Sequence, residues 1–242
     1  MKNYPPIGEV EGKKQQVEEM FDAIAPRYDL LNRILSLGID RSWRRKAVEM
    51  LREESPKRIL DVATGTADLA IEALALDPKK IVGVDLSEEM LKIGRQKVEK
   101  LGETDRIQLR RGDSERLPFS DKQFDAALVA FGVRNFENLR KGLSEIARVL
   151  KPGGTLVVLE FSHPRAFPVK QLYQLYSKHV LPRIGNAVSK NDGAYRYLPD
   201  SVAAFPDGDA FLSEMKVAGF TDLRQKPLTF GIASLYKGRT PA

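Results

Sequence analysis

Four aspartates stand where an α/β protein places its ligand-binding groups. Asp61 and Asp68 flank a turn of small residues, while Asp85 and Asp113 each end or follow a predicted strand. Groups at the carboxyl ends of parallel strands gather at one edge of the sheet, where the ligands of such proteins bind. Four carboxylates would repel a pyrophosphate. They suit a ligand with an ammonium, a sulfonium, two ribose hydroxyls and an adenine amino group.

The turn between the first two aspartates reads Ala-Thr-Gly-Thr-Ala, and its small side chains let a ligand approach the backbone. A dinucleotide site usually has the pattern G-x-G-x-x-G, whereas Gly65 is the one glycine of this turn. Taken singly, Asp61 or Asp68 is equally well explained as a turn residue or a charge at a helix N-terminus. The whole pattern favours a nucleoside ligand, with Asp85 accepting hydrogen bonds from the ribose hydroxyls.

Strands and helices that alternate along the chain would position these groups. Two last strands, 222–226 and 230–236, are separated by residues 227–229, so short a connection that they must be antiparallel. The predicted fold class is α/β, a doubly wound, mostly parallel sheet that ends in an antiparallel hairpin, as in class I S-adenosylmethionine-dependent methyltransferases. The other predicted strands are 57–61, 80–85, 107–111, 124–131 and 155–161, and the helices among them are 66–76, 88–101 and 139–150.

The chain is expected to form a single domain with four parts. Residues 1–55 read as an N-terminal helical cap and 56–164 as the cofactor-binding core. Residues 165–205 break the alternation and are rich in tyrosine, which indicates a helical substrate insertion. Residues 206–242 supply the C-terminal helix and hairpin.

Composition excludes several kinds of site. The 242 residues include no cysteine, which rules out disulfides, thiolate metal sites and a cysteine nucleophile. His163 and His179 are the two histidines, so we expect no metal, and a lone histidine is more often structural than a base. No stretch is long and apolar enough to span a membrane, and the first residues lack the apolar region of a signal peptide. We therefore expect a cytoplasmic protein.

Four blocks of sequence are more specific than the alternation of strands and helices. From about residue 17 to 236 they resemble the UbiE-type C-methyltransferases of menaquinone and ubiquinone biosynthesis. The blocks are 28–43, with Tyr-Asp-Leu-Leu-Asn, Gly38 and Trp43; Phe131-Gly-Val-Arg-Asn135; 148–162, with Lys-Pro-Gly-Gly and Leu-Glu-Phe-Ser; and 180–201, with Leu-Pro-Arg-Ile-Gly and Ala-Tyr-Arg-Tyr-Leu.

The chain departs from the family pattern at a few positions. Residues 63–68 read Ala-Thr-Gly-Thr-Ala-Asp, where many members have Ala-Gly-Gly-Thr-Gly-Asp. Asp40 stands where a histidine is frequent, and Ala130 stands where some members have a serine that contacts the cofactor. We therefore expect no side-chain contact with the cofactor at Ala130.

The resemblance implies S-adenosyl-L-methionine (SAM) as the cofactor. The family's SAM-binding residues match Thr66, Asp85, Asp113 and Ser114, and the pattern at the strand ends adds Asp61 and Gly65. The implied substrate is a polyprenylated quinol, first of all demethylmenaquinol. The alternative is the ubiquinone precursor 2-methoxy-6-polyprenyl-1,4-benzoquinol.

Methyl transfer to a quinol carbon needs positioning and a way to accommodate loss of the hydroxyl proton, but no metal and no covalent nucleophile. Arg134 follows the fourth predicted strand and is expected to lower the quinol pKa or to orient a water that takes the proton. Asn135 is expected to fix a ring oxygen. Tyr176, Tyr195 and Tyr197 could line an aromatic pocket, and ordinary packing explains each of them equally well.

Other interpretations and partners remain open at this stage. A nicotinamide-dependent dehydrogenase would need fewer acids at the strand ends. The net charge of +6 suggests an RNA methyltransferase, yet the chain has no recognisable nucleic-acid module, so we expect no nucleic-acid partner. A homodimer is left open. Apolar and basic residues in 13–24 and 165–205 predict transient contact with the inner surface of an anionic membrane, unless they pack on the core.

Overall fold

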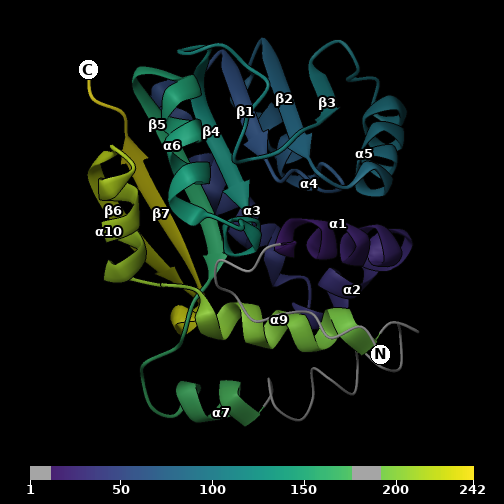
Figure 1. Ribbon diagram of the computed structural model, residues 1–242, viewed down its shortest axis with the longest axis vertical. Coiled ribbons are helices and arrows are strands. Elements are labelled where there is room, and N and C mark those ends of the chain that lie inside the picture. The colour runs from purple at the N-terminus through teal and green to yellow at the C-terminus, as the bar shows by residue number, and fades with distance from the viewer. Residues whose placement is uncertain (1–11, 176–191) are drawn as a thin grey trace.

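The computed structural model describes residues 12–175 and 192–242. Its centre is a seven-stranded sheet with the order β3-β2-β1-β4-β5-β7-β6 (Figure 1). β7 runs antiparallel to both β5 and β6, and the other pairs are parallel. The predicted fold class is confirmed. The strands are β1 Arg58–Val62, β2 Lys80–Asp85, β3 Ile107–Arg111, β4 Phe124–Ala130, β5 Leu150–Phe161, β6 Thr221–Leu228 and β7 Ala233–Arg239.

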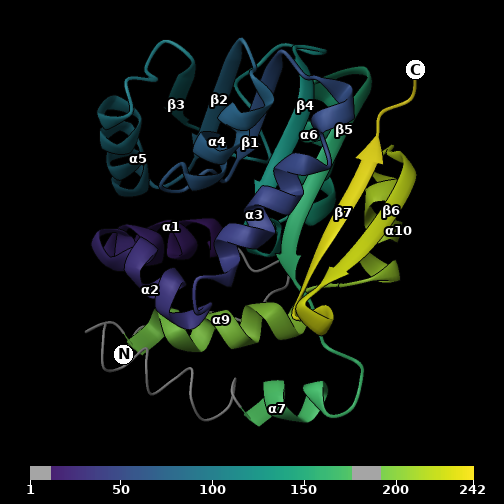
Figure 2. The same ribbon diagram turned by 180° about the vertical axis from the view of Figure 1, so that it is seen from behind.

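Helices cover both faces of the sheet (Figures 1 and 2). One face packs against α3 Ile39–Glu49, α4 Asp68–Glu72 and α5 Glu88–Lys100, and the other against α6 Leu139–Val149 and α10 Asp209–Val217. β1, β2 and β4 are therefore buried on both sides and consist mainly of apolar residues, as expected for inner strands of a parallel sheet.

A further helical layer lies beyond the carboxyl ends of the parallel strands. In Figure 1 these strands point toward α1 Lys13–Ile24, α2 Tyr28–Leu35 and α9 Asp192–Ala204, with α7 Val169–Leu175 farther out. Val17 and Met20 of α1 pack with Leu31 of α2 and Tyr197 of α9 in a small apolar cluster. The N-terminal cap and the described part of the insertion thus form one layer, and the apolar face of α1 is buried in it.

Three predicted elements differ from the structure. The strand predicted at 155–161 begins at Leu150. The predicted helix 66–76 begins only at Asp68, and after Glu72 it tightens into a 3-10 turn. The hairpin turn was expected at 227–229 but lies at Thr229–Gly231, because Pro227 continues β6 and pairs with Ser234. β6 is an edge strand, where a residue without an N–H group costs no ladder hydrogen bond. The 3-10 turns are Ala25–Arg27, Arg52–Glu54, Ala73–Leu76, Val133–Asn135 and Thr229–Gly231.

Candidate active site

Asp85 lies at the carboxyl end of β2, with its carboxylate held by the backbone. Its Oδ2 accepts a hydrogen bond from the N–H of Gly65 at 2.8 Å, and its Oδ1 accepts one from the N–H of Ser87 at 2.9 Å. Burial raises the pKa of Asp85 to about 6, although these N–H groups favour the ionised form. Gly65 has φ +54°, and a Cβ there would find its nearest neighbour, the Tyr28 ring, 4.0 Å away. The backbone of this turn is therefore open on the cavity side.

Asp61 lies next to Asp85 at the end of β1. Its Oδ2 accepts a hydrogen bond from the Thr64 hydroxyl at 2.5 Å, whereas its buried Oδ1 has no hydrogen-bond partner among the described residues. Burial raises the pKa of Asp61 to about 7; the Thr64 hydroxyl and, to a smaller extent, the backbone N–H of Ala70 oppose this rise, while the charge of Asp85 adds to it. The Ala70 N–H does not have the geometry of a hydrogen bond to Oδ1. A buried acceptor without a donor is rare in folded proteins, and here it suits a ligand that brings an ammonium. These residues fit the amino-acid end of SAM.

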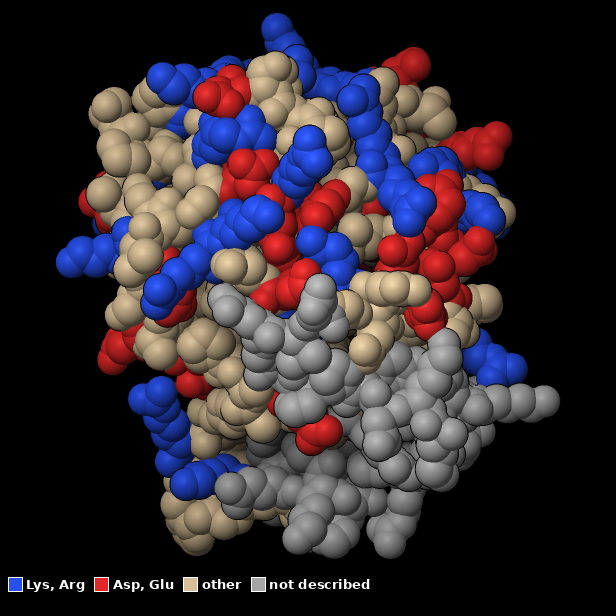
Figure 3. Space-filling model, in the orientation of Figure 1, with Lys and Arg blue, Asp and Glu red and all other residues tan. Residues whose placement is uncertain are grey.

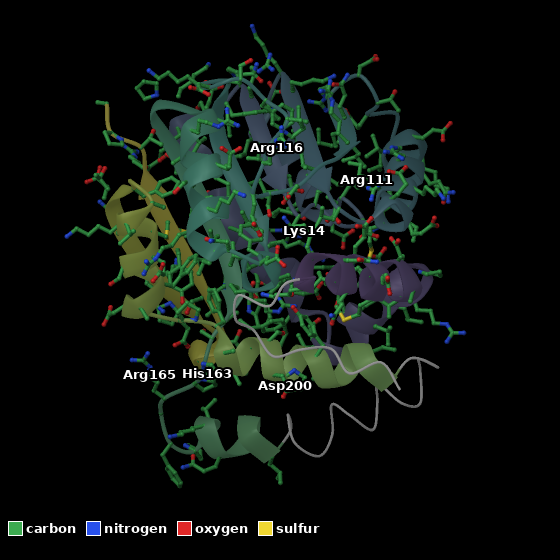
Figure 4. The ribbon with its side chains drawn as sticks, viewed as in Figure 1. Lys14, Arg111, Arg116, His163, Arg165 and Asp200 are labelled. Atoms are coloured by element: carbon green, nitrogen blue, oxygen red, sulfur yellow. The ribbon has the colours of Figure 1, made fainter. Side chains whose placement is uncertain are left out.

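A small cavity of about 70 Å³ lies between α1 and the ends of β2 and β3. Its walls combine polar groups with an apolar floor, as an adenosine would require. Lys14 projects from α1 toward the loop after β3 and covers this cavity (Figure 4). The lining includes Lys14, Phe21, Val84, Asp85, Ser87, Met90, Ser114 and Glu115.

A much larger cavity of about 550 Å³ lies under the outer helical layer, and its walls are mainly apolar. Three aromatic rings stand together in its wall: the centroids of Phe131 and Phe161 are 4.6 Å apart, and that of Trp43 is 6.1 Å from Phe131. Trp43 also donates a hydrogen bond from Nε1 to the Thr229 hydroxyl at 2.8 Å. A flat aromatic ligand could stack in this wall.

The two cavities meet along a common wall. Side chains or backbone of Phe21, Tyr28, Ala63, Gly65, Ala130 and Phe131 line both of them. Ala130 and the small residues of the turn leave room there. A group bound in one cavity can therefore come close to a ligand in the other, which is the arrangement that group transfer between two ligands requires.

Arg134 lies in the wall of the larger cavity, but its charge is compensated. Its Nη1 pairs with Oε1 of Glu160 at 2.8 Å and donates to the Phe131 carbonyl at 2.5 Å. Nε donates to the Ser201 hydroxyl at 3.3 Å. Glu160 is fully buried, and burial raises its pKa even though Arg134 opposes the shift. The pair acts as a neutral unit whose guanidinium still presents N–H groups to the cavity.

Asn135 and Tyr197 are joined across the two cavities. The Tyr197 hydroxyl donates to Oδ1 of Asn135 at 3.0 Å, and burial raises the pKa of Tyr197 to about 12. Tyr197 lines the larger cavity and Asn135 the smaller one. Tyr195 lies on α9, but its side chain is outside the described part of the structure, as is the whole of Tyr176.

An ion-pair network occupies several residues expected near the cofactor. The Thr66 hydroxyl donates to Asp29 at 2.6 Å and accepts from Lys97 at 3.0 Å. Asp68 pairs with Lys97 at 2.7 Å and with Arg44 at 3.1 Å. Thr66 and Asp68 still line the larger cavity, yet their polar atoms already have protein partners.

Asp113 and Ser114 follow β3. The carboxylate of Asp113 pairs with Lys14 at 2.6 Å, and it does not line either cavity. Ser114 does line the smaller one. The structure therefore brings Asp61, Gly65, Asp85 and Ser114 to the cavity walls and turns Asp113 toward α1.

Sequence reasoning missed the aromatic wall. Trp43 is buried in the core and also lines the larger cavity. Phe131, Phe161 and Tyr28 were not predicted to contact a ligand, although these residues and Trp43 lie within the sequence blocks that suggested a family. The family-specific sequence blocks were therefore the feature of the sequence from which these cavity-lining residues could have been predicted. His163 lies apart from the described cavity walls, with Nδ1 3.1 Å from Oδ2 of Asp207, and His179 is outside the described residues.

Comparison with known sequences gives matches over almost the whole chain. The sequence profile of the ubiE/COQ5 methyltransferase family matches residues 9–240. Demethylmenaquinone methyltransferase of Bacteroides fragilis is 50% identical over 97% of this chain and 98% of its own, and that of Deinococcus radiodurans is 50% identical over 98% and 97%. The ubiquinone/menaquinone biosynthesis C-methyltransferase UbiE of Geotalea daltonii is 50% identical over 93% and 97%.

Comparison with solved structures supports the fold. A SAM-dependent methyltransferase of Thermotoga maritima superposes with a TM-score of 0.64 at 20% identity, covering 92% of this chain and 98% of its own. The [4+2]-cyclase SpnF superposes with a TM-score of 0.67 at 18% identity and covers 100% of both chains. Because a cyclase and a methyltransferase share this architecture, the fold alone does not fix the reaction.

Proposed function

The chain belongs to the ubiE/COQ5 methyltransferase family, and we propose that it transfers the methyl group of SAM to a ring carbon of demethylmenaquinol. The meeting of the two cavities carries this proposal. The smaller cavity offers Asp85 and Ser114 for a nucleoside, Asp61 stands beside it in the wall of the larger cavity for an amino-acid group, and the larger cavity offers an aromatic wall and space for an isoprenoid tail. Their common wall is where the two ligands would touch.

Four residues are proposed to hold the cofactor. Asp85 would accept hydrogen bonds from the ribose hydroxyls, since its carboxylate is fixed by two backbone N–H groups. Asp61 would receive the ammonium on its unpartnered Oδ1. Gly65 would allow close approach to the backbone, and Ser114 would contact the adenine side of the smaller cavity. Thr66 is proposed to act indirectly, because its hydroxyl is engaged with Asp29 and Lys97.

SAM supplies an electrophilic methyl group on a sulfonium. The chain's part is to make the quinol carbon nucleophilic: a ring hydroxyl would lose its proton to water, so that electron density moves to the adjacent carbon. As the new C–CH₃ bond forms, the S–CH₃ bond would break and S-adenosylhomocysteine would leave. The methylated carbon would then give up its ring proton to water while the oxygen regains one, which restores the quinol. Arg134 is proposed to donate a hydrogen bond to that oxygen and to stabilise its negative charge. Because Glu160 neutralises part of this charge, hydrogen bonding contributes more than the net charge of Arg134.

Tyr197 and Asn135 are proposed to orient the ring. Tyr197 stays protonated at neutral pH because its pKa is about 12, so it is a donor rather than a base. Its hydrogen bond holds the Asn135 amide, whose NH₂ group donates weakly to the Phe131 carbonyl at 3.4 Å and keeps a second N–H for a ring oxygen that reaches the common wall from the larger cavity. The rings of Phe131, Phe161 and Trp43 would hold the quinol flat against the common wall and exclude water.

A direct assay tests the reaction. The protein is incubated with methyl-labelled SAM and, in parallel, with demethylmenaquinol or the single-ring ubiquinone precursor. Label should enter the ring of demethylmenaquinol, and the oxidised quinone should not react because it is itself an electrophile. The second substrate is included because relatives at 50% identity are named for both ubiquinone and menaquinone biosynthesis. Absence of label from both quinols would refute the proposed function.

The substrate's tail belongs to a membrane, so we also propose a peripheral, cytoplasmic-side contact with the bilayer. Among the described helices, none is long and apolar enough to cross a membrane. On the face shown in Figure 3, Lys and Arg alternate with Asp and Glu over the described area. An interleaved pattern of this kind lacks the basic stripe that a nucleic-acid groove needs.

A further inference from the structure

The exposed large apolar side chains are concentrated at one end of the molecule. Except for Leu101 and Val217, those in the described residues belong to α2, the turn between α2 and α3, the first residue of α3, residues 167–175 or the β6–β7 turn. These segments lie at the end toward which the parallel strands point, beside and below α9 (Figures 1 and 2). The exposed apolar residues at this end are Leu30, Ile34, Leu37, Ile39, Phe167, Leu175 and Phe230.

Leu37 and Phe230 occupy the tips of two turns. Leu37 is 86% exposed with φ +51°, and Phe230 is 78% exposed with φ +56°. Bulky L-residues rarely adopt this conformation, and here no burial of the side chain compensates for it. Large apolar side chains that are exposed at residues with an unfavourable backbone conformation indicate a surface that contacts a partner or a membrane in the functional state.

The two turns are joined at the mouth of the larger cavity. Trp43, which follows the first turn, donates its hydrogen bond to Thr229 of the second. Leu37, Ile39 and Phe230 line the cavity while also being exposed, so they form its rim. Apolar side chains therefore stand both in the aromatic wall and at the outer rim of the same cavity.

Exposed basic residues lie on the segments that carry these apolar side chains, and the acidic Asp200 of α9 is exposed at the same end (Figure 4). Arg33 of α2, Arg41 of α3 and Lys170 of α7 are exposed. Lys226 is exposed close to the β6–β7 turn, and Arg165 lies at the same end of the molecule (Figure 4). Apolar tips framed by cations match an anionic lipid surface, in which the tips enter the headgroup layer and the cations meet phosphates.

We propose that the turn tips at Leu37 and Phe230 insert into an anionic phospholipid bilayer and place the mouth of the larger cavity on its surface. An apolar tail could then slide from the bilayer into the cavity without crossing water. This inference rests on the proposed function in taking that tail to be the quinol's. It differs from the membrane contact expected from sequence, because the apolar face of α1 is buried against α2 and α9.

Because the chain has no cysteine, a single probe can be placed at will. Leu37→Cys and Phe230→Cys, each labelled with a polarity-sensitive fluorophore, are mixed with vesicles of equal parts phosphatidylglycerol and phosphatidylcholine. Leu101→Cys, an exposed leucine at the end of α5, is the matched control. We expect a blue shift and increased emission for the two tip probes and no change for the control.

A second measurement uses unlabelled protein. Co-sedimentation of wild type with the same vesicles should exceed that of the double variant Leu37→Asn/Phe230→Asn by about fivefold or more. The control double variant Leu101→Asn/Val217→Asn should sediment like wild type, and matching melting curves would show that all three are folded. Three outcomes would overturn the inference. They are failure of the wild-type protein to sediment with the vesicles, the same emission from the probes at Leu37 and Phe230 with and without vesicles, and tip variants that change the oligomeric state and leave vesicle binding unchanged.

A separate assay tests the proposed methyl transfer independently of membrane binding. Methylation of a demethylated naphthoquinol that lacks a tail is measured in solution without vesicles. Product there supports the reaction whatever the vesicles show, and its absence counts against the reaction even if the tips bind lipid.

Discussion

The two cavities differ in how the chain builds them. The smaller one is formed where strands of one sheet end, and its key carboxylate, Asp85, is fixed by backbone N–H groups two residues away and in the neighbouring turn. The larger one is assembled from helices and turns that are far apart in sequence and meet through side chains, as in the hydrogen bond from Trp43 to Thr229. Proteins that share this fold can therefore keep the same cofactor site at the sheet edge while their substrate sites, built from helices and turns, differ.

If this division holds, changes at residues of the larger cavity other than the strand-end group around Asp61, which also lines it, should alter turnover and leave SAM affinity unchanged. Arg134→Ala should have the largest effect. Removal of a hydrogen-bond donor to the developing charge is expected to lower kcat by roughly 100-fold or more. It also leaves Glu160 buried and unpaired, which should lower the free energy of unfolding by about 3–5 kcal/mol. Steady-state kinetics, calorimetry with SAM and thermal unfolding measure the three quantities.

The double variant Arg134→Ala/Glu160→Gln separates stability from chemistry. It removes the uncompensated charge, so the melting temperature should recover in large part while kcat stays low. A loss of SAM affinity equal to the loss of kcat would place Arg134 on the cofactor side and break the division.

The converse change lies in the smaller cavity. Asp85→Ala should weaken SAM binding by about 1–3 kcal/mol, because both ribose hydroxyls lose their acceptor. KM for a quinol should change little. Calorimetry gives the first value and kinetics at saturating SAM the second. Wild-type SAM affinity in this variant would show that the ribose is bound elsewhere.

The sheet edge could be predicted because its signals are local. The end of β2 at Asp85, the helix after Ser87 and the open turn at Gly65 depend on strand pattern, capping and backbone freedom, each visible within a few residues. The cap that Ser87 gives Met90 follows directly from residue type. Pro227 misled the placement of the hairpin turn, since its tolerance in β6 depends on that strand being at the edge of the sheet.

The substrate side could not be predicted in the same way. An aromatic residue that lines a cavity has the same pattern as one in a core, so Trp43 and Phe161 gave no separate signal. The partners of charged groups could not be predicted either. The sequence suggests that Arg134 is a free cation, whereas the structure places Oε1 of Glu160, near the end of β5, 2.8 Å from its Nη1. Thr66 likewise meets Asp29 only because α2 folds over the turn.

Titration of the two strand-end carboxylates sharpens the comparison further. The pKa values of Asp61 and Asp85 are about 7 and about 6, both raised by burial. If the ammonium of SAM binds ionised Asp61, affinity should fall by about tenfold for each pH unit below about 7. Asp61→Asn should bind SAM more weakly at about pH 8 and lose much of this pH dependence. Calorimetry across the range tests it, and an unchanged pH profile would exclude Asp61 from the cofactor site.

The same shifts affect stability in the opposite sense. A raised pKa means that the folded protein without cofactor binds more protons than the unfolded chain at pH values between the ordinary carboxyl pKa and about 7. The free energy of unfolding should therefore fall as pH rises through that window. Asp61→Asn should raise the melting temperature of the cofactor-free protein at about pH 8 while it weakens SAM binding. A lower melting temperature for Asp61→Asn would show that the buried, ionised carboxylate of Asp61 is not what destabilises the cofactor-free protein at this pH.

The smallest effect is expected at Asp113, where two roles can be separated. The sequence predicts a direct contact with the cofactor, but the structure pairs this carboxylate with Lys14 of α1 at 2.6 Å, with both side chains partly exposed. If its role is to tie α1 over the smaller cavity, Asp113→Asn should weaken SAM binding by only about 0.2–1 kcal/mol, since a partly exposed ion pair contributes no more. Lys14→Gln should then cause a similar loss, and high salt should reduce both. A loss for Asp113→Asn as large as that for Asp85→Ala, with Lys14→Gln unaffected, would instead mean that α1 moves, that the pair opens and that Asp113 binds the cofactor directly.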